Sequence, residues 1–407
     1  MVRTANIFVA LFTKGSFLSD LDANKRERFL RDLRAAKKEA AAGVSVGRAK
    51  AAASVWEIWQ NFCADMGLDP FLEAVQDQVP FLQVFAQRVR SGELASNGHP
   101  ILARSVEDYL RHVAQTFQGV GARDPRKQLG ERTVDFRLLR QQAAWKKQDP
   151  PPHRVKPVPI QVIRHIARLA SFSALDSSRA ISDMITLAFF FLLRPGEYVD
   201  TNSDSTPFTL ADVSLYLGDT YLDLTKATDQ QLLTATRVTL TFTTQKNGVR
   251  GEVIGLCSSG DPLLCPVRAA ARRVIYLRTH NAPPGTPLAR LFTQASEDIT
   301  SIKARNITRT IQQAVKSIGI SLGFLPSDVT ARSLRAAGAN ALLLADVDPH
   351  IIRLIGRWKS DEMLRYLHVQ AAPLMEQYAK KMLHGGVYTL LPNAQHLLPS
   401  ATLVPLH

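Results

Sequence analysis

Cysteines are few in this sequence, and no spacing typical of metal ligands is visible. Among 407 residues there are three cysteines, Cys63, Cys257 and Cys265, and no two of them form a CxxC pair. The ten histidines form no HExxH pattern. A zinc module needs such spacings, so the sequence argues against one. Sparse cysteines in odd number favour a reducing intracellular compartment over a disulfide-bonded secreted protein.

Long apolar runs are also missing. The longest one extends from Met184 to Leu193 and is bounded by Asp183 and Arg194. A run of this length suits a buried helix and is too short to cross a bilayer. We therefore expect a soluble intracellular protein with no membrane partner.

Acidic residues are outnumbered by basic ones. Fifty Lys and Arg residues stand against 36 Asp and Glu residues, which gives a formal net charge of +14. A surplus of this size attracts polyanions and favours a nucleic acid as partner. Residues 1–45 form a basic N-terminal arm that contains KRERFLRDLRAAKKEAAAG. This stretch predicts either a solvated helix or an arm that lies on phosphate or serves as a nuclear import signal.

Hydrophobic spacing divides the chain into domains. Residues 46–148 carry apolar side chains three and four residues apart, among them Val84, Phe85 and Val89 on one predicted face, and they predict an all-helical domain. Five prolines then occur in QDPPPHRVKPVPI. Because proline removes a backbone donor and fixes φ, residues 149–158 are expected to form an extended linker.

The following region, residues 159–385, mixes two periodicities. Helical patterns flank RVTLTFTTQKNGVRGEVIGL, where apolar residues alternate with threonines as in a β-strand. Asn247 and Gly248 tolerate positive φ and predict a β-hairpin turn. The expected fold class is thus mainly α with a small β-sheet, an α+β domain preceded by an all-helical one. The tail, residues 386–407, is expected to be extended.

Two short motifs in this region place basic residues at defined positions. LLRPGEY puts Arg194 directly after the apolar run, with Glu197 three residues later. TTQKNGVRG puts Lys246 at the tip of the predicted hairpin. Taken singly, an arginine beside a glutamate is usually a salt bridge, and a lysine in a turn is usually solvated.

Two further motifs follow. TARSLRAAGANALL carries Arg332 and Arg335 at i and i+3, so both side chains are expected to leave one helical face. GRWKSDEMLRYLH supplies Trp358 and Tyr366. Each motif alone has a plain structural explanation, and only their order and combination are unusual.

This combination resembles the tyrosine recombinase family of the phage-integrase type. The resemblance covers roughly residues 158 to 385, and LLCPVRAA and SLRAAGANAL also look like family sequence. The helical region followed by a proline-rich linker looks like the family's core-binding domain. LLRPGEY together with GRWKSDEMLRYLH is more similar to the recombinases of eukaryotic mobile elements, including transposons, than to bacterial chromosome-dimer resolvases.

The resemblance implies a role for each matching residue. Tyr366 would attack the scissile phosphate, form a 3′-phosphotyrosyl link and release a 5′-hydroxyl. Arg194 and Arg335 would hold the non-bridging oxygens, since planar guanidinium groups match phosphate geometry. Lys246 would donate a proton to the leaving oxygen, and Glu197 would hold Arg194 in place.

The sequence departs from the family pattern at two places. The paired motif usually begins with His, here replaced by Arg332, which cannot act as a base at neutral pH and would serve as another phosphate clamp. Trp358 occupies the family's His-or-Trp position and is expected to pack and to donate through its indole N–H. Only eight residues separate it from Tyr366, one fewer than in the commoner pattern. His368 is then a candidate base, and Tyr378 is the reserve nucleophile.

The resemblance implies an enzyme that integrates or recombines double-stranded DNA and needs no metal, nucleotide or other cofactor. Its two domains would form a clamp around DNA. The protein would be a monomer when free and would assemble into a homo-tetramer on DNA. A catalytically decayed DNA-binding protein derived from a mobile element is the alternative, and a type IB topoisomerase is a third reading. The expected location is the nucleus in a eukaryote, and otherwise the cytoplasm or nucleoid.

Overall fold

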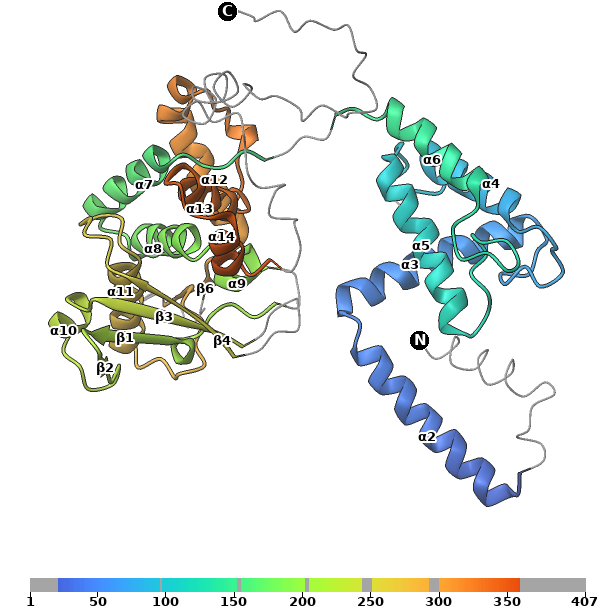
Figure 1. The fold of residues 1–407 in the computed structure, drawn as a ribbon, viewed down its shortest axis with the longest axis horizontal. Coiled ribbons are helices and arrows are strands. Elements are labelled where there is room, and N and C mark those ends of the chain that lie inside the picture. The colour runs from blue at the N-terminus through green and yellow to red at the C-terminus, as the bar shows by residue number, and fades with distance from the viewer. Residues whose placement is uncertain are drawn as a thin grey trace, which may run out of the picture. The chain divides into compact units, whose positions relative to one another are not determined.

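The computed structural model describes six stretches of the chain, 21–95, 97–151, 155–201, 205–243, 251–292 and 300–358. The chain divides into two compact units, Met1–His153 and Arg154–His407 (Figure 1). Their boundary falls inside the proline-rich stretch. The predicted residues Lys246 and Tyr366 lie outside the described residues, as do the alternatives His368 and Tyr378 and the Asn-Gly turn.

Unit 1 is helical throughout its described elements. The first helix of its described part, α2 (Ala23–Ala42), begins at the N-cap Asp22, whose side chain accepts from the amide of Lys25, and it buries no residue. The arm helix is therefore solvated along its described length. The other helices that the structure describes in unit 1 are α3 (Val46–Asp65), α4 (Val79–Ser91), α5 (Ala103–Gly119) and α6 (Phe136–Gln148).

Aromatic side chains form the core of unit 1. Trp59 is fully buried, its ring meets Phe85 edge-on at 5.0 Å, and its indole N–H donates to the carbonyl of Pro70 at 2.8 Å. The expectation that Val84 lies on the buried face of α4 is wrong, because Leu82 is buried and Val84 is exposed. Leu82, Phe85 and Val89 follow one another at spacings of three and four residues and form the buried face of α4, and Val84 lies outside that face.

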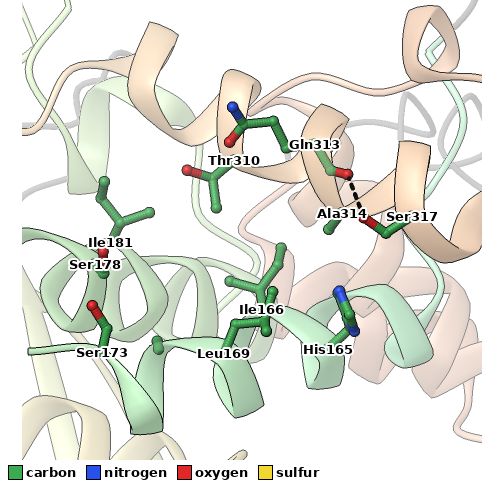
Figure 2. Close-up of a pocket in the computed structure, with 11 residues that line it drawn as sticks. His165, Ile166, Leu169, Ser173, Ser178, Ile181, Thr310, Gln313, Ala314 and Ser317 are labelled. Carbon is green, nitrogen blue, oxygen red and sulfur yellow. Dashed lines mark hydrogen bonds between the residues drawn. The ribbon is translucent and has the colours of Figure 1, made fainter.

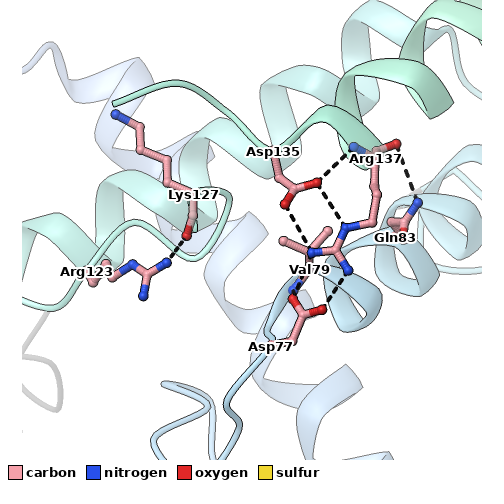
Figure 3. Close-up of polar contacts among 7 residues, drawn as sticks. All are labelled: Asp77, Val79, Gln83, Arg123, Lys127, Asp135 and Arg137. Carbon is pink, nitrogen blue, oxygen red and sulfur yellow. Dashed lines mark hydrogen bonds and ion pairs between the residues drawn. The ribbon is translucent and has the colours of Figure 1, made fainter. Parts of the chain in front are cut away.

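An arginine joins the N-termini of two helices of unit 1 (Figure 3). Arg137 donates from Nε to Asp135, the N-cap of α6, at 3.0 Å, and from Nη1 to Asp77 at 2.6 Å. Asp77 in turn accepts from the amide of Val79 in the first turn of α4. Hydrogen bonds from Arg137 lower the pKa of Asp135 to about 2, and they also lower the pKa of Asp77.

This network predicts that unit 1 loses stability in acid. A carboxyl whose folded pKa is depressed below the ordinary value near 3.9 stabilises the fold above that value, and this contribution disappears as the pH falls from about 4 towards 2. Asp135→Asn keeps a capping side chain but removes the charge. It should lower the Tm of unit 1 at pH 7 by about 2–4 °C, on the basis of ~1 kcal/mol for a partly exposed ion pair.

Tryptophan fluorescence can follow this transition, because three of the four tryptophans, Trp56, Trp59 and Trp145, lie in unit 1. The Asp135→Asn variant should also show a flatter dependence of Tm on pH between 4 and 2. Asp65→Asn, at the exposed end of α3, is the matched control and should follow the parent curve. Parallel curves for Asp135→Asn and the parent protein would contradict the assignment.

Unit 2 is mainly helical with a small antiparallel sheet. Its longer helices are α7 (Ile160–Phe172), α8 (Asp176–Phe190), α11 (Pro266–Thr279), α12 (Ala304–Ala314), α13 (Ser333–Leu344) and α14 (Pro349–Gly356). Two short helices are α9 (Pro195–Tyr198) and α10 (Asp229–Leu233), and a π-helical turn, Val315–Gly319, follows α12. The strands are β1 (Val213–Leu217), β2 (Thr220–Leu222), β3 (Arg237–Phe242), β4 (Glu252–Cys257), β5 (Arg290–Leu291) and β6 (Thr300–Ser301).

The main sheet has the order β2-β1-β3-β4, and α11 packs against it (Figure 1). Alternate residues of β3 are buried, among them Val238, Leu240 and Phe242. Strands β3 and β4 pair antiparallel from Arg237 opposite Cys257 to Phe242 opposite Glu252, so the predicted hairpin is confirmed in its two strands. The expected fold class, mainly α with a small β-sheet, is also confirmed.

A lysine fixes the start of unit 2 after the prolines. Lys156 donates from its amide to the carbonyl of Asp328 at 2.7 Å and from Nζ to the carboxylate of Asp328 at 2.9 Å. Pro159 is the N-cap of α7. The chain is thus held on unit 2 four residues before α7 begins.

Candidate functional site

The buried apolar run ends in a turn that leaves carbonyl groups without helical partners. Helix α8 stops at Phe190, and Leu192 adopts a left-handed conformation with φ 50°. A non-glycine residue in this region is unusual and marks a turn held by its surroundings. The carbonyl oxygens of Phe191 and Leu192 consequently become available to side chains from other helices.

Arg194 follows this turn and forms a reciprocal cap with Glu197. The amide of Arg194 donates to Glu197 Oε2 at 2.8 Å, and Arg194 Nη1 donates to Glu197 Oε1 at 2.9 Å. The Arg194 side chain remains 28% exposed, whereas that of Glu197 is 8% exposed. Proline at the first position of α9 favours the tight turn between them. The carboxylate therefore orients a guanidinium that solvent can still reach.

Arg335 lies deeper than Arg194, on the face of α13 that packs against α8. It is 2% exposed, and its guanidinium donates from Nη1 to the carbonyl of Leu192 at 2.5 Å and from Nη2 to the carbonyl of Gly356. The guanidinium carbon lies 4.2 Å from the centre of the Trp358 ring, which is itself buried. Arg335 thus connects the turn after α8 with the end of α14.

Arg332 lies three residues before Arg335 but differs from it in exposure. It is the N-cap of α13 with helical backbone angles, its amide donates to the Thr330 hydroxyl, and its side chain is exposed. That both guanidinium groups leave one helical face stays a prediction. Solvent reaches Arg332 and, in part, Arg194, whereas Arg335 is enclosed.

Arg357 is a functional candidate that the sequence reading missed. It sits in left-handed conformation at the C-cap of α14 and is 6% exposed. Its Nη1 donates to the carbonyl of Phe191 at 3.2 Å, and its Nη2 donates to Glu197 Oε2 at 3.2 Å and to the carbonyl of Leu192 at 3.2 Å. Burial lowers the pKa of Arg357, and the charge of Glu197 opposes that change. An arginine at the end of the apolar stretch HIIRLIG is the signal that could have found it, as it did for Arg194.

The hairpin strand ends beside this cluster. The guanidinium of Arg357 lies 3.9 Å from the centre of the Phe242 ring, and Phe242 is the last residue of β3. Lys246 follows four residues later and Tyr366 follows eight residues after Trp358, both outside the described residues. The described part of the chain therefore brings together Arg194, Glu197, Arg335 and Trp358 with Arg357.

A separate cavity of about 280 Å³ lies between α7, α8 and α12 (Figure 2). His165 and Leu169 from α7 line one wall, and Thr310 and Gln313 from α12 line the other. None of the residues that line it is Arg194, Arg335 or Arg357, which together form the arginine cluster of the candidate site. It carries no part of the site described above.

Within the described ranges, no three His, Cys, Asp or Glu side chains gather closely enough to hold a metal ion. No helix among the same residues combines the length and apolarity needed to span a membrane.

No protein-family model matches this sequence, and no curated protein matches it. Among solved structures, the Tn1549 transposon integrase in complex with transposon right end DNA is similar with a TM-score of 0.43 and 15% identity, over 76% of this chain and 85% of that one. A lambda integrase dimer bound to a COC′ core site gives a TM-score of 0.44 and 14% identity, over 83% and 95%. XerA recombinase is similar with a TM-score of 0.35 and 14% identity, over 81% of this chain and 98% of that one.

The similar structures are tyrosine recombinases and integrases. Their TM-scores lie below 0.5, so the roles proposed below come from the contacts and chemistry of this chain's own residues.

Proposed function

We propose that this protein is a site-specific tyrosine recombinase that cuts and rejoins double-stranded DNA. The observation that carries the proposal is the convergence of Arg194, Arg335 and Trp358 around the turn at Leu192. Arg335 and Leu192 are separated by 143 positions in the sequence, yet a hydrogen bond joins them. The motifs quoted above, which name the same residues by their order, support the same conclusion.

The proposed reaction needs a nucleophile, charge neutralisation and an acid. The Tyr366 oxygen attacks the phosphorus, the bond to the 5′ oxygen breaks, and Lys246 gives that oxygen its proton. The phenol proton of Tyr366 passes to His368 or to water, because Arg332 cannot accept it. Arginine side chains stabilise the charge on the non-bridging oxygens, with Arg194 as the accessible one. The phosphotyrosine retains the energy of the broken bond, so rejoining needs no nucleotide.

Arg335 enters this scheme only with a change at the site. At 2% exposure its guanidinium cannot touch a phosphate until Trp358 or another covering group shifts. DNA binding supplies the free energy for such a shift in our proposal. We further propose a homo-tetramer on two duplexes, as recombination requires four strand cleavages, and a nuclear location if the source is a eukaryote.

The second candidate function is a DNA-binding protein that has lost cleavage. The enclosure of Arg335 by two carbonyl groups and a tryptophan favours it, because a residue held in this way can be purely structural. Arg332 at the position usually held by His supports the same reading. Both candidates predict a steep loss of affinity with salt, so binding alone does not separate them.

Covalent trapping separates the two candidates. The parent protein and Tyr366→Phe are incubated in EDTA with a pool of nicked duplexes, in which a cleaved strand diffuses away and cannot be rejoined. A denaturing gel should show a protein–DNA adduct for the parent and none for Tyr366→Phe, with DNA affinity changed less than about threefold because one hydroxyl is removed. Tyr378→Phe is the matched control and should form the adduct at the parent rate.

Three outcomes would change the proposal. Tight binding without an adduct from any variant would establish the DNA-binding candidate. An adduct that survives Tyr366→Phe but disappears in Tyr378→Phe would move the nucleophile to Tyr378. An adduct that requires a divalent metal would contradict the proposed chemistry.

A further inference from the structure

The carboxylate of Glu197 lies between two arginines. Arg194 approaches it from one side with its amide and Nη1, at 2.8 and 2.9 Å, and Arg357 approaches Oε2 from the other side at 3.2 Å. The side chains of Glu197 and Arg357 are 8% and 3% exposed, so little water screens this contact. The three side chains form a small charged unit that is buried at one end and open at Arg194.

The charges of this unit do not cancel. Arg194 and Glu197 alone would form a neutral pair, whereas Arg194, Glu197 and Arg357 together carry a net +1. Burial lowers the pKa of Arg357, Glu197 opposes that change, Arg194 adds to it, and Glu252, which is paired across the sheet with Phe242, opposes it more weakly than Glu197 does. The negative charge of Glu197, which orients Arg194, is therefore balanced by a second guanidinium, that of Arg357, on its buried side.

Compensation matters for the function proposed above. A phosphate group that gains negative charge during cleavage is stabilised by the field of the whole site, and a partly buried carboxylate next to the clamp opposes it. If Glu197 were balanced only by Arg194, the cationic clamp would present little net charge to DNA. Arg357 removes this conflict because it supplies the missing positive charge without itself reaching solvent.

We propose that Arg357 is a positioning residue that compensates the charge of Glu197 and so leaves the charge of Arg194 available to the scissile phosphate. This inference rests on the proposed function. Arg357 also donates to the carbonyls of Phe191 and Leu192 and lies over the Phe242 ring, which places the end of β3 beside the guanidinium that binds Glu197. It touches no substrate atom and acts only through Arg194.

A rescue experiment tests this assignment against a purely structural role. Arg357→Gln should slow single-turnover adduct formation by about 10²-fold, the effect of losing one electrostatic contact in a site of this kind. The double variant Arg357→Gln with Glu197→Gln removes both charges of the inner pair and should recover at least about tenfold of that loss. Arg357→Lys keeps the charge on a single donor head and should stay within about tenfold of the parent rate.

The outcomes are distinct. If Arg357→Lys is as slow as Arg357→Gln, or if Glu197→Gln brings no recovery, Arg357 serves geometry alone and the proposal is overturned. Rates are measured well below each variant's Tm, so a loss of folding cannot imitate a loss of charge. If the parent itself forms no Tyr366-dependent adduct, the proposed function fails and this inference fails with it. An active parent with an equally active Arg357→Gln variant would reject only the inference.

Discussion

Arg335→Lys is expected to lower the single-turnover rate of adduct formation by about 10²–10³-fold, the usual cost of losing one charge-stabilising contact, which Arg335 would make once DNA binding has uncovered it. Lysine keeps the positive charge, but its ammonium is a single compact donor group, whereas the planar guanidinium of arginine donates in several directions. It can reach the carbonyl of Leu192 or that of Gly356, but it cannot join both and also face a phosphate. Arg335→Ala would be less informative, since it removes the guanidinium that donates to the buried carbonyl of Gly356, at a cost of about 1–3 kcal/mol, and leaves the carbonyl of Leu192 with Arg357 as its side-chain donor.

Unit 2 offers a matched control for this prediction. Arg273 is also 2% exposed, donates to the carbonyls of Leu288 and Arg290 at 2.8 and 2.6 Å, and lies 4.5 Å from the ring of Tyr276. Its contacts repeat those of Arg335 away from the candidate site. Arg273→Lys should therefore lower the Tm of unit 2 to a similar extent and leave the cleavage rate near that of the parent. Equal rates for both lysine variants would mean that Arg335 only holds the two carbonyls together.

The elements of unit 2 could be predicted from sequence because their patterns are local. Alternation of apolar residues and threonines is enough to specify the strand that ends at Phe242, and Pro159 marks the start of α7. The apolar run to Leu193 was correctly assigned to a buried helix, but its last residues form a turn. Left-handed Leu192 could not be predicted, since the carbonyl partners that hold it come from side chains more than 140 residues away.

The candidate site was predictable only in part for the same reason. Order in the sequence names Arg194 and Arg335, but it cannot say that Arg335 is enclosed while Arg332 is exposed. That difference depends on where α13 begins and on how closely it approaches α8. Arg357 was missed because its role depends on Glu197, 160 positions away, and only its place at the end of the apolar stretch HIIRLIG marks it in the sequence.

Gly338→Ala is expected to have the largest effect on stability. Gly338 lies at the contact of α13 with α8, where an added Cβ would stand 2.2 Å from the carbonyl oxygen of Phe189 and 3.3 Å from the side chain of Leu192. The first atom belongs to the backbone of a buried helix and cannot rotate away, so the two helices must separate. Overpacking of this kind costs about 3 kcal/mol or more, which corresponds to a Tm lower by about 6–12 °C for a unit of this size.

The same substitution should also impair the site, because α13 carries Arg335 and the end of α8 carries the carbonyl that Arg335 binds. Calorimetry of the parent and Gly338→Ala should show a lower transition for unit 2 and an unchanged one for unit 1. Gly47→Ala is the control, since Gly47 is exposed in α3 with no atom within 4 Å of an added Cβ, and alanine there should be neutral or slightly stabilising. A normal Tm for Gly338→Ala would mean that α13 can shift without cost, and the close packing that positions Arg335 would then not be needed.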